Sequence, residues 1–380
     1  MNTGNVLLIA TSSLVGYQLL EDKSLATLPL ALQFLGTMLT TIPASMLMKR
    51  IGRRAGFILG TLFGVVGASL AAWSILHNNF FFFCVSTTLV GVFNGFGTYY
   101  RFAAADVASI DYRPAAISYV MAGGVVAAVL GPNLANWTHG FFAATQFVGS
   151  YLALVGIYLV SLLVTLFLTI APPQPHESQA SGRPLREIAR QARYIVAVTG
   201  AALGFGVMSL VMTATPLAMQ HHTHPFSDTT FVIEWHVLGM FAPSFVTGHL
   251  IRRFGVLTIM LTGAVLSGLC VLINLLGVDL LHFWLALLLL GIGWNFLFVG
   301  GSSLLIETYR VEEKAKAQAL NDFMVFTMVT LASLSAGVLQ YNFGWRAINI
   351  GVLPAILVVF FAILWLKRKL STENSAREIV

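Results

Sequence analysis

Residues 45–54 read SMLMKRIGRR, and residues 248–255 read GHLIRRFG. Each segment follows a long apolar run and joins it, through basic residues and a glycine, to the next apolar run. The two glycines, Gly52 and Gly255, stand about 203 positions apart. A turn that recurs at this separation indicates that the chain is built from two related halves.

The composition of the chain is that of a membrane protein. Of its 380 residues, 57% are hydrophobic and 9% are charged, and the mean hydropathy is +0.83, whereas a soluble domain is about 25% charged. A span needs about 20 apolar residues and must satisfy its own backbone hydrogen bonds, so the long apolar runs are predicted to be helices. We therefore predict an all-α membrane protein with twelve transmembrane helices, at about residues 3–20, 26–48, 56–76, 80–104, 115–137, 147–170, 194–220, 231–251, 256–276, 282–306, 319–341 and 347–366.

The first predicted helix is short. At 1.5 Å per residue it reaches about 25 Å, against a hydrocarbon core of about 30 Å. We therefore expect the natural start of the protein to lie upstream of Met1.

The longest polar stretch, rich in proline and arginine, follows the sixth apolar run. This position predicts a six-helix half at 1–171, a cytoplasmic linker at 172–193, a second six-helix half at 194–367 and a cytoplasmic tail at 368–380. A second echo supports the repeat, because the segment from Gly91 to Asn94 resembles the segment from Gly291 to Trp294.

Basic residues fall almost entirely on alternate loops. If the N-terminus is cytoplasmic, the outer loops hold only Lys23 and Arg346, while the inner loops and tail hold nearly all other lysines and arginines. This bias predicts a multi-pass protein of a bacterial plasma (inner) membrane with both termini in the cytoplasm. The net charge of +6 is thus a topology signal. The lipid bilayer is an expected partner, nucleic acid is not, and we expect a monomer.

This layout resembles the major facilitator superfamily. The superfamily's loop motif, Gly-x-x-x-Asp-Arg-x-Gly-Arg-Arg, has Ser45 and Lys49 in place of its glycine and aspartate. The resemblance implies alternating access, in which two halves rock around a central cavity lined by helices one, two, four, five, seven, eight, ten and eleven. It also implies that the matching loop residues gate this motion; they are Arg50, Gly52, Arg53 and Arg54 in the first half and Gly248, Arg253 and Gly255 in the second.

Two pairs of soft metal ligands lie on the seventh and eighth predicted helices. Met208 and Met212 form one pair, and His236 and Met240 form the other. A spacing of four residues places both side chains of a pair on one helix face, and thioether with imidazole suits Cu(I). Counted at 1.5 Å per residue from the loop between the helices, the four side chains lie at similar depths, about 8 to 18 Å. The alternative is plain core packing, the usual role of paired methionines.

Several segments resemble the CcoA-like copper importers of this superfamily. They are residues 24–29 (SLATLP), 41–45 (TIPAS), 236–245 (HVLGMFAPSF) and 293–296 (GWNF). The resemblance implies copper uptake towards assembly of cytochrome oxidase, with Met208, Met212, His236 and Met240 as ligands. Copper import is therefore the main prediction, with copper as transported substrate and no resident cofactor.

The same family also includes riboflavin importers, so a second hypothesis stays open. A riboflavin site needs aromatic stacking surfaces and hydrogen-bonding groups. Tyr99, Tyr100, Arg101, Trp294 and Asn295 could supply them. On this alternative the chain imports riboflavin or another small organic solute, and the methionine and histidine pairs are structural.

Two weaker metal candidates remain. His221, His222 and His224 occupy the loop between the seventh and eighth helices and could collect a metal ion, although a solvated loop is the favoured interpretation, because a histidine-rich tract indicates metal binding by composition alone. Met324 and Met328 could form a relay site, or pack in the core. Because no phosphate-binding loop, metalloprotease histidine pair or nucleophile elbow is present, an enzyme is not expected.

Overall fold

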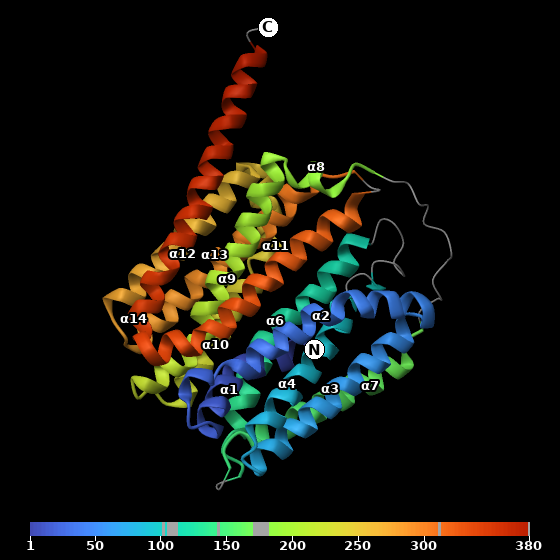
Figure 1. Cartoon of the computed structure of the whole chain (residues 1–380), viewed down its shortest axis with the longest axis vertical. Helices are drawn as coiled ribbons and strands as arrows, with labels where there is room; N and C mark the ends of the chain where they lie inside the picture. The colour runs from blue at the N-terminus through green and yellow to red at the C-terminus, as the bar shows by residue number, and fades with distance from the viewer. Residues whose placement is uncertain (101–102, 105–112, 143–144, 170–181, 311–312, 379–380) are drawn as a thin grey trace.

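The computed structural model describes residues 1–100, 103–104, 113–142, 145–169, 182–310 and 313–378. Within these ranges every regular element is a helix. The helices pack side by side as a bundle, from which the last turns of the chain project (Figure 1). The predicted all-α architecture is confirmed.

The first half of the chain forms six long helices, one for each predicted span. A short 3-10 helix, η1 (Lys23–Leu25), precedes the second of them. The long helices are α1 (Asn2–Leu19), α2 (Leu28–Ile51), α3 (Arg53–Leu76), α4 (Phe80–Gly97), α6 (Arg113–Thr138) and α7 (Val148–Phe167).

The second half departs from the predicted spans in two places. The eighth span is broken at Ala242 and Pro243, and the eleventh and twelfth spans follow each other without a loop, as two helical segments of α14 separated by a kink at Gly344, where φ is 75°. The elements are α8 (Leu185–Ala189), α9 (Ala192–His221), α10 (Phe226–Phe241), α11 (Ser244–Phe254), α12 (Val256–Leu276), α13 (Leu280–Ile306) and α14 (Lys314–Glu378). The predicted tail therefore begins as a helical continuation of α14.

Eight of the described helices are long and apolar enough to cross a membrane by length and composition. The other four predicted spans correspond to α1, to α6, to the broken pair of α10 and α11, and to the second pass that α14 makes beyond its bend. The break between α10 and α11, and the continuity of α14 across its kink, account for two of these four spans.

The repeated glycine turn has the same backbone geometry in both halves. Gly52 has φ 84° and ψ 156°, and Gly255 has φ 83° and ψ 148°. The N–H of Gly52 donates to the Met48 carbonyl at 3.0 Å, and that of Gly255 to the Ile251 carbonyl at 2.8 Å. Only glycine adopts this backbone region readily, which explains why both turns contain it.

The segments that contain Gly91 and Gly291 are alike in structure as well as in sequence. A Cβ on Gly91 of α4 would lie 2.2 Å from the carbonyl oxygen of Gln33 on α2, and a Cβ on Gly291 of α13 would lie 2.3 Å from that of His236 on α10. Each glycine thus allows two helices to cross in close contact. Gln33 and His236 stand 203 positions apart, as Gly52 and Gly255 do.

The bundle has two ends, which we name by their chain segments. The linker end carries α8 and the junction between α13 and α14, and the histidine-loop end carries residues 221–224. Helix α2 ends next to Gly52, and α11, which continues α10, ends next to Gly255. Both glycines lie at the linker end.

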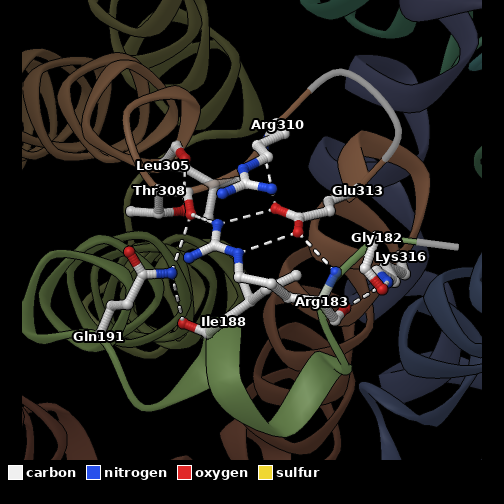
Figure 2. Close-up of polar contacts among 9 residues, drawn as sticks. All are labelled: Gly182, Arg183, Ile188, Gln191, Leu305, Thr308, Arg310, Glu313 and Lys316. Carbon is white, nitrogen blue, oxygen red and sulfur yellow. Dashed lines mark hydrogen bonds and ion pairs between the residues drawn. The ribbon is translucent and has the colours of Figure 1, made fainter.

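At the linker end, the segment before α8 is fixed to the junction between α13 and α14 (Figure 2). The buried carboxylate of Glu313 accepts hydrogen bonds from Arg183 through its backbone N at 2.7 Å, Nε at 2.9 Å and Nη2 at 2.8 Å. The N–H of Arg310 donates to the same carboxylate at 2.9 Å. These hydrogen bonds, led by those of the Arg183 side chain, lower the pKa of Glu313 from 4.5 to about 2.

Further bonds extend this contact, which we call the linker clamp. The Arg183 Nη2 and the Gln191 side chain both donate to the carbonyl of Thr308, at 3.1 and 2.8 Å. Lys316 donates to the carbonyls of Gly182, at 3.1 Å, and Arg183. The linker clamp therefore ties the start of the second half to its own helices α13 and α14.

Candidate functional site

A cavity of about 450 Å³ lies between the two halves of the bundle. Its walls come from α1, α2, α4, α6, α9, α10, α13 and α14, which are the first, second, fourth, fifth, seventh, eighth, tenth and eleventh predicted spans. These are the eight helices that the family resemblance implied. The prediction of a central cavity between two halves is confirmed.

The second half contributes an aromatic wall to this cavity. Phe205 of α9, Phe241 of α10 and Phe298 of α13 line it. Behind them the Trp294 ring lies parallel to Phe298, with centroids 5.0 Å apart and an interplanar angle of 10°, and it meets Phe205 edge-on at 5.1 Å. Such a surface suits a planar, largely apolar ring system. We call these four residues the aromatic wall.

The predicted organic-site residues are only partly brought together. Tyr99 and Tyr100 line the cavity from the first half, and the Tyr99 hydroxyl donates to the Thr41 carbonyl at 2.9 Å. Trp294 belongs to the aromatic wall, and its indole Nε1 is buried with no hydrogen-bond partner among the described residues. Arg101 lies outside the described residues.

Asn295 holds the break between α10 and α11. Its amide Nδ2 donates to the Met240 carbonyl and to the Ser244 hydroxyl, both at 2.7 Å, and its Oδ1 accepts from the Thr247 hydroxyl at 2.7 Å. Pro243, at the break, has no N–H to donate. These three hydrogen bonds stabilise the break between the two helices. Asn295 therefore has a structural role and does not line the cavity.

The four predicted copper ligands lie in the interior. Met208, Met212 and Met240 are buried in one apolar cluster. His236 is fully buried, its Nδ1 lies 2.7 Å from the Leu287 carbonyl, and its Nε2 has no partner among the described residues. Helix α10 packs mainly on α13 and α6 and little on α9. The polar contact of α10 through His236 is to α13. The metal-ligand role of these residues stays a prediction.

The three loop histidines do not converge. His221 and His222 border a second cavity of about 760 Å³ at the histidine-loop end. His224 is not among its walls: its Nε2 lies 2.8 Å from the Val278 carbonyl, and its Nδ1 lies 3.6 Å from Asp228. Burial, followed by the neighbouring imidazoles, lowers the pKa of His222. Among the described residues no group of three or more histidine, cysteine or acidic side chains is placed to hold a metal ion.

The second methionine pair has two different surroundings. Met324 is 41% exposed, whereas Met328 packs against an apolar cluster beside Gly206 of α9. This arrangement agrees with the packing alternative for Met328. Their relay role stays a prediction.

The loops predicted to gate the motion differ in their side-chain contacts, and their gating role stays a prediction. Arg53 donates to the Tyr99 carbonyl at 3.5 Å, and Arg54 donates to the Leu166 carbonyl at 2.5 Å, near the ends of α4 and α7. In the second half the Arg253 guanidinium lies 5.3 Å from the Phe254 ring centroid. Arg50 is exposed, and a Cβ on Gly248 would meet no atom within 4 Å. The two turns are thus alike in backbone but not in side-chain contacts.

Contacts between the halves close the bundle at the histidine-loop end. Asn133 of α6 donates to Glu234 of α10 at 2.7 Å. The Phe226 ring lies 4.9 Å from His139 and 5.1 Å from Phe147, measured between centroids. Thr27 contacts α14 through a hydrogen bond of 2.8 Å to a backbone carbonyl.

Sequence reasoning missed Phe205, Phe241 and Phe298. The chain holds 28 phenylalanines, and helical spacing alone does not tell which of them face a cavity. The usable signal was the family resemblance, since it named the helices on which these residues lie.

Two repeated halves around a central cavity define a membrane transporter. The model of the Major Facilitator Superfamily matches residues 1–233 and 198–378, and the chain belongs to this superfamily. Riboflavin transporter RfnT of Brucella anthropi is 42% identical over 367 residues, which cover 96% of this chain and 92% of that protein.

Two further relatives come from Bacillus subtilis. The MFS-type transporter YddS is 27% identical over 96% of this chain and 88% of its own length, and the MFS-type transporter YdeG is 26% identical over 92% and 86%. The prediction of a transporter of this superfamily is confirmed.

The prediction of copper import is wrong. A relative with 42% identity along nearly the whole chain carries the name of a riboflavin transporter, so the family resemblance does not point to a metal. The methionine pair that suggested copper is part of the apolar interior, where a thioether serves as a flexible filler.

Proposed function

We propose that the chain imports riboflavin, or a closely related flavin, by alternating access. The observation that supports this most is the cavity between the halves, lined on one side by the aromatic wall. The 42% identity to a riboflavin transporter points the same way. This is the alternative that the sequence left open.

The cavity suits a flavin in size and chemistry. Its volume of about 450 Å³ falls within the usual range for small-molecule sites, about 300–1,000 Å³. The isoalloxazine ring is planar and aromatic, so one face of it would stack against Phe205, Phe241 and Phe298. Tyr99 and Tyr100 would face it from the first half.

Charge and closure support an inward-facing state for this structure. The excess of arginine and lysine at the linker end favours a cytoplasmic location for that end and for both termini, in the plasma membrane of a bacterium. The cavity includes Thr41 and Asp322, from the linker-end parts of α2 and α14, while Asn133 and Glu234 hold the opposite end closed. On this reading the structure is the inward-facing state, from which substrate leaves for the cytoplasm.

The test is uptake of labelled riboflavin by cells that express the chain, compared with cells that carry an empty vector. Trp294→Leu should lower uptake at least tenfold, because it removes the ring of the aromatic wall that packs against Phe298 and Phe205. Trp284→Leu, on the same helix but beside Phe231 and Trp235, is the matched control and should leave uptake within twofold. Wild-type cells that accumulate no more riboflavin than the vector control would refute the proposal.

A further inference from the structure

Three side-chain amides from three helices of the first half meet at one oxygen. The Oδ1 of Asn5 on α1 accepts from the Nε2 of Gln33 on α2 at 3.0 Å and from the Nδ2 of Asn94 on α4 at 2.6 Å. Gln33 is 1% exposed and Asn94 is 4% exposed. We call these three residues the amide cluster.

The amide cluster leaves two acceptors unused. The Oε1 of Gln33 and the Oδ1 of Asn94 are buried and have no hydrogen-bond partner among the described residues. Buried polar atoms in folded proteins are normally paired, so each such atom calls for an explanation. A ligand that brings hydrogen-bond donors would supply what both oxygens lack.

The amide cluster lies directly behind the cavity wall. Asn2 and Thr3 of α1 and Gly97 of α4 line the cavity, and they stand within about one helical turn of Asn5 and Asn94 respectively. Helix α1 contacts α2, α6, α9 and α10, so it is enclosed by protein. The open surface of the half-buried Asn5 therefore faces the interior of the bundle.

The second half repeats this arrangement with different side chains. His236 corresponds to Gln33 and Trp294 corresponds to Asn94, by the two sequence echoes and by the glycine crossings beside them. His236 Nε2 and Trp294 Nε1 are also buried without a partner among the described residues. Because His236 Nδ1 faces a carbonyl, it carries the proton, and the Nε2 of the neutral ring is an acceptor. Equivalent positions in both halves thus hold unpaired polar atoms beside the cavity.

Three other residues with unpaired atoms, Asn274, Gln340 and Trp345, line the second cavity, at the histidine-loop end. The amide cluster lies instead next to the cavity between the halves.

We propose that the amide cluster binds the hydroxyl chain of the substrate while the aromatic wall binds its ring. This inference rests on the proposed flavin transport. Riboflavin carries a ribityl chain with four hydroxyl donors, and Gln33 and Asn94 hold two neutral acceptors behind the cavity wall, with which such donors would pair. The ring and the chain would then contact opposite halves of the protein. Selectivity for a flavin with its polyol chain would arise from the first half.

The experiment measures binding of riboflavin and lumiflavin to the purified full chain by quenching of flavin fluorescence. Lumiflavin has the same ring system but a methyl group in place of the ribityl chain. The wild type should bind riboflavin at least tenfold more tightly than lumiflavin. Gln33→Leu and Asn94→Leu should each weaken riboflavin binding about tenfold and leave lumiflavin binding within twofold.

Asn349→Leu is the matched control. Asn349 is fully buried, pairs with Asn274 at 2.8 Å and lies in the second half, away from the amide cluster. The same change there should leave the preference for riboflavin over lumiflavin unaltered. Lumiflavin binding also reports whether each variant is folded.

Three results would overturn the inference, and they have different meanings. If the wild type binds both flavins equally, the hydroxyl chain is not recognised, whatever the variants do. If Gln33→Leu and Asn94→Leu bind lumiflavin but keep the full preference for riboflavin, the amide cluster is not the site of the chain. If the wild type binds and transports neither flavin, the proposed function itself fails.

Discussion

The hydroxyl of Thr27 on one half bridges two backbone groups of α14 on the other half. It donates to the Ser333 carbonyl at 2.8 Å and accepts from the Gly337 N–H at 3.0 Å. Ser333 and Gly337 are four residues apart, so these are the groups that a regular helix pairs with each other. A side chain of the first half is thereby inserted into the hydrogen-bond ladder of the second.

Thr27→Val should loosen this closure, because valine keeps the shape of threonine but neither donates nor accepts. Loss of a buried hydrogen-bonding group costs about 1–3 kcal/mol, which would shift the population away from the state closed at the histidine-loop end. Disulfide formation between cysteines introduced at His139 and Phe226, whose rings lie 4.9 Å apart across the halves, should become slower. Thr262→Val, whose hydroxyl bonds within its own helix, should not change the rate.

Gly337→Ala should act in the same direction through crowding. A Cβ at Gly337 would lie 2.7 Å from the Ser24 carbonyl and 2.8 Å from the Thr27 hydroxyl oxygen, closer than van der Waals contact. We expect at least a fivefold fall in riboflavin uptake with normal amounts of protein in the membrane. Gly351→Ala, on the same helix with no atom within 4 Å of the new Cβ, is the control, and equal uptake by both variants would contradict the prediction.

The linker clamp should depend on pH. The folded pKa of Glu313, about 2, lies below its ordinary value of 4.5, so the carboxylate contributes its full stabilisation above pH 4.5 and loses it as the pH falls towards 2. Hydrogen exchange of the Arg183 amide, which donates to Glu313 at 2.7 Å, should therefore be slow at pH 5 and faster, after correction for intrinsic rates, near pH 2.

Glu313→Gln should give fast exchange of the Arg183 amide already at pH 5, because the charge that holds the guanidinium is lost. The exposed pair of Arg193 and Glu307, 2.6 Å apart, provides the comparison, since exposed ion pairs contribute about 0–1 kcal/mol. Glu307→Gln should leave the exchange at Arg183 unchanged. Slow exchange in Glu313→Gln would show that other contacts hold the linker.

Met208→Leu and Met212→Leu should leave riboflavin uptake nearly unchanged. Both methionines are buried in an apolar cluster, and volume-conserving apolar exchanges of this kind usually cost less than about 1.5 kcal/mol. Uptake of labelled riboflavin and the thermal unfolding midpoint are the measurements. A loss of uptake in both variants with an unchanged midpoint would mean that the sulfur atoms have a chemical role.

The turn at Gly52 and Gly255 shows what sequence can predict in this chain. A backbone conformation that only glycine adopts readily leaves a direct trace in the sequence, and the apolar runs between such turns determine the number of helices. The break at Pro243 was missed because it depends on Asn295, 52 positions further on, which holds the ends of the two helices together.

The site was harder to predict, for a physical reason. Whether Met208 binds an ion or fills space depends on which helix faces it, and α10 packs on α13 more than on its neighbour in sequence, α9. Likewise, the unpaired oxygens of Gln33 and Asn94 become visible only when all their neighbours are placed. The type of a residue shows which interactions its side chain can make. Which atoms it contacts is decided by how the helices pack.

The unpaired oxygens of the amide cluster also bear on how this protein should be engineered. Each buried polar atom without a partner costs about 1–3 kcal/mol, so an apolar residue at either Gln33 or Asn94, with the other amide still donating to Asn5, would make the empty protein more resistant to heat. A screen for thermostable variants, as used to prepare membrane proteins for crystallisation, would therefore select changes at these positions. The most stable variants would then be the ones that had lost selectivity for the substrate.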